Sequence, residues 1–174
     1  MTTDNRRANT KKAIQNAMVT LLKTKSFDDI TTTKLAKEAG ISRSSFYTHY
    51  KDKFELIDSC QQTLFNQIEY IFEKHVGDKE AAFLEIFEFL KREQLLSALI
   101  SANGTREFQT FIVNKVRLFI NTDFQRRFKR EKLTPVEAEY SSIYLASAFF
   151  GLCQAWIANG KKESPRQMTN LVLK

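Results

Sequence analysis

Between residues 43 and 48 the chain concentrates hydrogen-bond donors at helical spacing. Arg43 and Tyr47 are four residues apart, and so are Ser44 and Thr48, so on a helix each pair projects from one face. This face carries a guanidinium, hydroxyls and an aromatic ring, and it carries no acid. An arginine can donate two hydrogen bonds to a guanine edge in the major groove, and hydroxyls can reach bases or phosphates. The pattern indicates contact with nucleic acid.

Catalysis by the same segment is the alternative from a different class. Ser45 and His49 are also four residues apart, which places a hydroxyl beside an imidazole. Such a pair is not a catalytic triad without an acid and an oxyanion hole, and no such constellation is evident. Neither His49 nor His75 has a partner at metal-ligand spacing, and no Gly-rich phosphate loop occurs. The sequence therefore predicts no enzyme, no metal site and no cofactor.

The net charge is concentrated in the segment that holds these side chains. Residues 1–53 contain 11 Lys and Arg against 5 Asp and Glu, whereas residues 54–174 contain 16 against 15. A basic end joined to a nearly neutral body is typical of a nucleic-acid-binding domain attached to a domain of another kind. We therefore expect a boundary after Lys53, with domains 1–53 and 54–174.

The chemistry-bearing residues must be positioned by two short helices. Thr31 and Ser42 are each a plausible N-cap, and each stands between an apolar residue before it and another at the fourth helical position. Gly40 lies between the two helices, where a left-handed residue can end the first helix before a tight turn. Helix, short turn and second helix are the elements of a helix-turn-helix.

Longer helices are expected on both sides of this motif. An apolar stripe at helical spacing from Ile14 to Leu22, with basic residues ahead of it, predicts the first helix. Asp52 and Glu55 can form a capping box for a helix that ends near His75. Further helices are predicted over 78–91, 95–100 and 105–130, and after the N-cap signals at Thr134 and Ser164. With only 5 Gly and 2 Pro, the chain is predicted to be all-α.

The segment ITTTKLAKEAGISRSSFYTHYKDK, residues 30–53, closely resembles the DNA-binding domain of TetR-family regulators. The family pattern there is roughly T-x-x-x-[IL]-A-x-x-A-G-[VI]-S-x-x-[ST]-[LF]-Y-x-[HY]-[FY]-x-x-K, and the match runs upstream to Thr10 without gaps. The resemblance implies an all-α homodimer that usually represses transcription until an effector binds the C-terminal domain. It also implies that Tyr47, His49 and Lys53 contact phosphates and that Thr32 and Thr33 contact double-stranded DNA from the preceding helix.

The expected DNA contacts combine the residues implied by the TetR resemblance with the residues inferred from the face of residues 43–48. They are Thr32, Thr33, Arg43, Ser44, Ser45, Tyr47, Thr48, His49 and Lys53. A second basic run, from Arg126 to Lys132, is interpreted as a solvated helix end rather than another anion site.

The body leaves two questions open. Thirteen of its residues are phenylalanine, and these rings can either enclose an effector pocket or fill the core. The segment from Ala148 to Pro165 looks like the closing segment of one TetR subgroup, some of whose short members are activators controlled by a protein partner. The expected function is therefore a repressor that binds a palindromic operator, with a coactivator controlled by a protein partner as the alternative.

The helix expected from Pro135 to about Asn159 has apolar residues all around its axis, which predicts burial on two sides. One side can pack on its own body, and the other requires a second subunit. The residues predicted at the homodimer interface are Ala148, Gly151, Leu152, Ala155 and Trp156. The apolar run is short for a membrane span and no export signal is evident near the start, so a cytoplasmic protein without membrane contact is expected.

Overall fold

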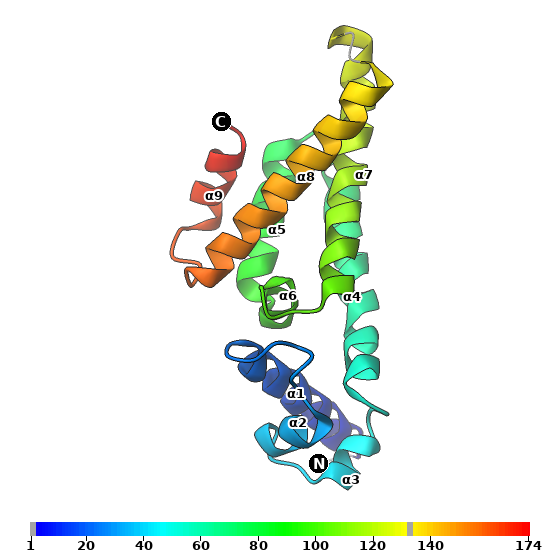
Figure 1. Cartoon of the computed structure of the whole chain (residues 1–174), viewed down its shortest axis with the longest axis vertical. Helices are drawn as coiled ribbons and strands as arrows, with labels where there is room; N and C mark the ends of the chain where they lie inside the picture. The colour runs from blue at the N-terminus through cyan, green and yellow to red at the C-terminus, as the bar shows by residue number, and fades with distance from the viewer. Residues whose placement is uncertain (1–2, 132–133) are drawn as a thin grey trace. The chain divides into compact units, whose positions relative to one another are not determined.

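The computed structural model describes residues 3–131 and 134–174, with side chains for 4–121 and 134–174. In this part of the chain every regular element is a helix and there is no strand, which confirms the predicted all-α class (Figure 1). The basic run from Arg126 to Lys132 lies outside the residues whose side chains are described. The helices are α1 Thr3–Leu22, α2 Thr32–Glu38, α3 Arg43–Tyr47, α4 Lys53–Lys74, α5 Lys79–Arg92, α6 Gln94–Ile100, α7 Arg106–Glu131, α8 Pro135–Ala158 and α9 Pro165–Val172.

Side-chain caps begin four of these helices where the sequence predicts them. The hydroxyl of Thr31 accepts a hydrogen bond from the Lys34 N–H, and that of Ser42 accepts one from the Ser45 N–H. Complete capping boxes begin α8 at Thr134 and α9 at Ser164. Each cap satisfies a backbone N–H that has no partner within its helix, which fixes where the helix starts.

The start of α4 differs slightly from the expected capping box. Asp52 Oδ1 accepts hydrogen bonds from the N–H groups of Phe54 and Glu55, both at 2.9 Å. The Glu55 carboxylate bonds to the backbone N–H of Lys51, one residue before the position that a capping box requires. The helix nevertheless starts as predicted, because the Asp52 side chain alone supplies the cap.

The described chain forms two compact units, and the first is larger than the predicted DNA-binding domain. Unit 1 comprises residues 1–68 and 93–105, so it includes α6. Asn103 explains this, because its side-chain amide donates to the Leu22 carbonyl and its backbone carbonyl accepts from the Phe27 N–H, both at 2.8 Å. These bonds attach the loop after α6 to the end of α1. The prediction that residues 1–53 bind DNA and residues 54–174 form a domain of another kind stays a prediction.

The core of unit 1 contains the stripe predicted for its first helix. Ile14, Ala17, Met18, Leu21 and Leu22 are all buried. However, α1 begins at Thr3, so the basic residues ahead of the stripe belong to the same helix and share its faces.

Unit 2 comprises residues 69–92 and 106–174 and has an aromatic core. The Phe87 ring packs edge-on against both Phe149 and Trp156, with ring centroids 5.7 and 5.4 Å apart. Phe83 also lies against Phe149, at 5.0 Å. Many of the body's phenylalanines therefore pack against one another, which is how large rings fill a core.

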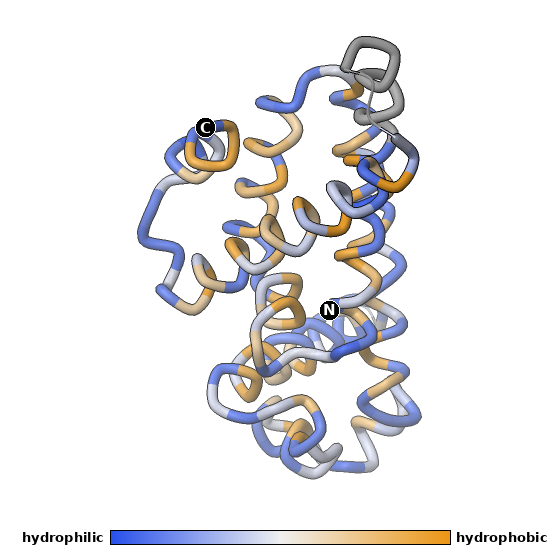
Figure 2. Tube along the Cα trace, turned by 45° about the horizontal axis from the view of Figure 1, so that its top comes forward, coloured by the Kyte–Doolittle hydropathy of each residue, from blue (hydrophilic) through white to orange (hydrophobic). Residues whose placement is uncertain are grey.

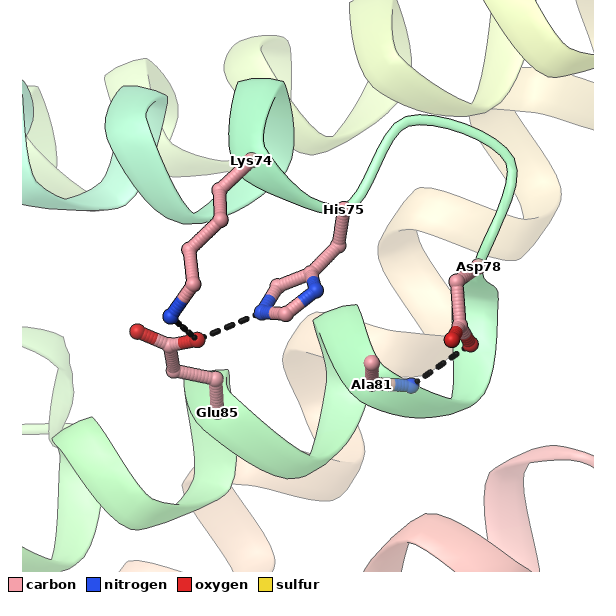
Figure 3. Close-up of polar contacts among 5 residues, drawn as sticks. All are labelled: Lys74, His75, Asp78, Ala81 and Glu85. Carbon is pink, nitrogen blue, oxygen red and sulfur yellow. Dashed lines mark hydrogen bonds and ion pairs between the residues drawn. The ribbon is translucent and has the colours of Figure 1, made fainter.

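Polar contacts hold the corner between α4 and α5 within unit 2 (Figure 3). The Glu85 carboxylate accepts hydrogen bonds from Lys74 Nζ at 2.8 Å and from His75 Nε2 at 2.5 Å. The hydrogen bonds from Lys74 and then His75 lower the pKa of the Glu85 carboxyl. Asp78 Oδ1 accepts the Ala81 N–H at 3.0 Å and so caps α5, and Gly77 turns the chain with a φ of 91°. His75 is therefore occupied in a structural contact.

The two sides of α8 have different surroundings. Figure 2 shows how hydrophobic and hydrophilic residues alternate along this and the other helices. One side is buried in unit 2 and the opposite side is exposed, although it carries large apolar groups. Tyr140 and Tyr144 are 68% and 72% exposed. The buried residues of α8 are Ala138, Ser142, Ala146, Phe149, Cys153 and Trp156.

Candidate nucleic-acid interface

The turn between α2 and α3 depends on the backbone of Gly40. This residue has a φ of 67°, a left-handed conformation that glycine adopts at little cost. Its N–H donates to the Lys37 carbonyl, and the Ile41 N–H donates to the Ala36 carbonyl. These bonds end α2 and lead directly to the Ser42 cap, so the two short helices are joined by a tight, fixed turn.

Packing of the Phe46 side chain fixes which face of α3 points outward. Phe46 is 0% exposed, and its ring contacts Tyr50, with centroids 6.0 Å apart. Because Phe46 occupies the inner face, Arg43, Ser44 and Tyr47 lie exposed on the rest of the helix. The structure thus brings together the donors that the sequence pattern grouped on one face.

Hydrogen bonds between the exposed side chains of α3 hold them in place. One guanidinium nitrogen of Arg43 donates to the Tyr47 hydroxyl at 3.3 Å, and the guanidinium lies 5.9 Å from the tyrosine ring centre. A guanidinium has five N–H donors, so most of them stay available for a base edge or a phosphate. The Ser42 and Ser44 hydroxyls share a hydrogen bond at 2.9 Å. The face is therefore partly preorganised and still rich in donors.

The remaining predicted contacts flank this face. Thr32 and Thr33 lie in the first turn of α2, half-buried and exposed respectively. Thr48 is exposed and donates to the Ser45 carbonyl at 2.7 Å, so its oxygen can still accept. Ser45 is half-buried on α3. His49 follows α3 and is also half-buried; burial, followed by the charges of Arg7 and Lys11, lowers its pKa.

Lys53 has a structural role that the sequence does not reveal. Its ammonium donates to the carbonyls of Phe27 at 2.7 Å and Asp28 at 3.0 Å, and it lies 4.6 Å from the Phe27 ring centre. Partial burial lowers the pKa of this lysine, although the nearby Asp28 and Asp29 oppose the shift. An ammonium has three donors, so at most one is left for a phosphate. The predicted phosphate contact stays a prediction.

Comparison with known families gives the assignment. Residues 14–60 match the family model described as bacterial regulatory proteins, tetR family. Residues 77–174, more than half of the chain, match the model of a transcriptional regulator C-terminal region of the TetR type. The chain belongs to the TetR family. The resemblance seen in residues 30–53 is confirmed, and TetR-type proteins are DNA-binding regulators rather than enzymes.

Two curated relatives are distant from this chain in sequence. An uncharacterised helix-turn-helix regulator of Bacillus subtilis, YxbF, is 22% identical over 167 residues, which is 91% of this chain and 42% of that protein. The nucleoid occlusion factor SlmA of Mannheimia succiniciproducens is 23% identical over 158 residues, covering 82% of this chain and 73% of SlmA. The chain thus spans less than half the length of YxbF.

A solved TetR regulator from Streptococcus agalactiae has the same fold. It superposes with a TM-score of 0.63 at 21% identity, covering 98% of this chain and 94% of that one. At this identity the likeness establishes the TetR fold and not the ligands or target genes.

The residues predicted at a TetR dimer interface divide into two sets. Ala148, Gly151 and Ala155 are exposed on α8, and Leu152 beside them is half-buried. Trp156 is 2% exposed within its own subunit, and its indole N–H donates to the Glu163 carbonyl at 3.3 Å. Trp156 is therefore a core residue of unit 2, and we place only the other four on the proposed interface.

Lys53→Ala should lower the free energy of unfolding by about 1–2 kcal/mol, because two carbonyls lose a charged donor at a partly exposed position. Urea denaturation would measure this loss. Lys51→Ala removes the same charge from a neighbouring exposed side chain and serves as the control. Equal stability of the two variants would show that the Lys53 bonds contribute nothing in solution.

Proposed function

We propose that this TetR-family chain is a cytoplasmic, homodimeric repressor that binds a palindromic operator. The observation that carries the proposal is the exposed donor face of α3, which the buried Phe46 holds outward. Arg43 and Ser44 read base edges from the first turn of α3, and Tyr47 and Thr48 lie beside them. Thr32, Thr33, Ser45, His49 and Lys53 add contacts around this face. Repression follows from the family resemblance.

The exposed side of α8 supports the homodimer. Val136, Tyr140 and Tyr144 are each more than 60% exposed, and small residues follow them along the same helix. Burial of such groups by a second copy removes apolar area from water, and the small residues let two helices approach closely. By length and composition alone α8 is also able to cross a membrane, although one such helix is weak evidence. We propose that a second subunit covers this side, not lipid.

We place the regulatory signal on residues 54–174, with a small-molecule effector as the first candidate. A protein partner acting on a coactivator remains the alternative function. Several polar residues on the helices of unit 2 do not lie in its interior: Tyr70, Asn114 and Tyr144 are exposed and Gln154 is half-buried. A reporter gene controlled by an operator that the protein binds separates the two functions. A repressor lowers reporter output when the protein is produced, whereas raised output supports activation.

Arg43→Ala should weaken operator binding by about 1–3 kcal/mol and relax base preference at one position in each half-site. The reason is the loss of a guanidinium that can bond two acceptors of one base in the major groove. Selection of bound sequences from a random pool, repeated with wild type and variant, measures the change. Lys37→Ala removes one positive charge from an exposed site on α2 and is the control. An unchanged sequence preference in the Arg43 variant would show that Arg43 does not read a base.

A further inference from the structure

The first turns of α1 carry basic side chains on the face that is buried farther along the helix. Arg7 and Lys11 are four residues apart, and Ile14 and Met18 continue the same face. Ile14 and Met18 are 0% exposed, whereas Arg7 and Lys11 are exposed. The face thus changes from apolar to basic where α1 extends beyond the core of unit 1.

This basic face of α1 lies next to the segment that follows α3. The Lys11 ammonium lies 5.8 Å from the centre of the Tyr50 ring. Arg7 lies one helical turn before Lys11 on the same face of α1. In agreement with this placement, the pKa of His49 is lowered first by burial and then by the charges of Arg7 and Lys11. Residues far apart in the sequence therefore place two cations and an imidazole together, directly after the face formed by Arg43 and Tyr47.

The His49 ring favours one tautomer. Within the described part of the chain its Nδ1 is buried and has no hydrogen-bond partner. A buried donor without a partner is rarer than a buried acceptor without one, so the proton belongs on Nε2. In this form the ring offers a neutral N–H donor from its other nitrogen, and it needs no proton from solution.

We propose that Arg7, Lys11 and His49 form a phosphate cradle that holds the DNA backbone beside the base-reading face of α3. The inference rests on the proposed DNA-binding function and adds α1 to the contact surface. Among the described residues, neither Arg7 nor Lys11 has an ion pair with a carboxylate. Two cations without an acidic partner and one N–H donor suit a phosphate, which has a negative charge and several acceptor oxygens.

The salt dependence of binding tests the cradle. The full-length double variant Arg7→Gln/Lys11→Gln is compared with Lys23→Gln/Lys25→Gln. The control loses the same charge just beyond Leu22, the last residue of α1, which lies about 16 Å along the helix axis from Lys11. The probe is a mixed-sequence duplex of about 40 base pairs, because phosphate contacts do not depend on sequence. Each cation that contacts a phosphate contributes about 0.9 to the slope of log affinity against log salt.

We expect the slope of the Arg7/Lys11 variant to be smaller than that of wild type by about 3.6, because each subunit of the proposed dimer loses two phosphate contacts, and the control slope to be unchanged. Between about 50 and 200 mM salt, wild-type affinity should then fall on the order of 100-fold more than that of the Arg7/Lys11 variant. If both double variants keep the wild-type slope, the cradle is wrong and the proposed function stands. If wild type itself shows no salt-dependent binding, the proposed function fails.

Two substitutions of His49 give an independent readout. Glutamine can place an amide donor close to the position of Nε2, whereas phenylalanine keeps the ring and has no donor. We expect His49→Phe to weaken binding about tenfold, the loss of one hydrogen bond to a charged acceptor, and His49→Gln to weaken it less. Helical circular dichroism confirms that each variant is folded. Equal affinity of His49→Phe and wild type would remove His49 from the cradle.

Discussion

Replacing Gly151 by leucine should convert the proposed dimer into a monomer that binds its operator about 100-fold more weakly or worse. Gly151 is exposed on α8 between Ala148 and Ala155, and a Cβ atom built there meets no atom within 4 Å beyond the adjoining backbone of its own helix. Within one subunit, a leucine at this position therefore meets only open space. A second helix packed closely against it would be displaced. Loss of the second half-site contact then removes the avidity that a dimer gains on a palindrome.

The subunit itself should not lose stability from this substitution. Leucine favours a helix over glycine by roughly 0.8 kcal/mol, so an isolated monomer should be as stable or more stable. Thr63→Leu adds a leucine at an exposed position of α4 and controls for the added apolar surface. Sedimentation velocity and operator titration are measured on both variants. A Gly151→Leu protein that remains dimeric and binds with full affinity would show that the interface lies elsewhere.

Gly104→Ala should lower the free energy of unfolding by about 3 kcal/mol or more. A Cβ atom at residue 104 would lie 1.8 Å from the Leu99 carbonyl oxygen and 2.4 Å from its carbon. Both are backbone atoms near the end of α6, so they cannot move aside as a flexible side chain does. Overpacking of this kind costs 1–3 kcal/mol, and more where the backbone must shift.

The damage should spread through the neighbouring loop. Asn103 precedes Gly104 and makes the hydrogen bonds to Leu22 and Phe27 that attach this loop to α1. Ala102→Ser changes an exposed side chain in the same loop and is the matched control. Urea denaturation followed by circular dichroism measures both proteins. A Gly104→Ala variant within about 0.5 kcal/mol of wild type would mean that the loop packs less tightly than the structure has it.

Local signals in the sequence account for much of the fold. The caps at Thr31, Ser42, Thr134 and Ser164 act through bonds to residues three positions away, so each can be recognised within a short window. For the same reason the outward face of α3 follows from the spacing of Phe46 and Arg43. Periodicity also predicts that α8 is apolar around its axis, but only the structure shows which side one subunit leaves uncovered.

The features that the sequence does not predict all depend on distant residues. Lys53 resembles a phosphate ligand by its position in the motif, yet its ammonium bonds to carbonyls more than twenty residues earlier. The place of α6 in unit 1 depends on two bonds made by Asn103. Arg7 and Lys11 lie ahead of the apolar stripe, so periodicity does not include them in the helix. Arg7 and Lys11 are spaced i, i+4, and Ile14 continues the same helical face. This spacing is the signal that could have placed both residues in the first helix.

We propose that two copies of this TetR-family chain read a palindrome through α3. Selection of bound duplexes from a random pool by the full-length protein tests it most directly. The predicted result is an enriched inverted repeat with half-site centres about one helical turn apart, 34–36 Å, or a multiple of that spacing. The repeat selected by the Arg43→Ala variant should lose base preference at one position in each half-site. Enrichment of a single site without twofold symmetry, or no enrichment at all, would contradict the account.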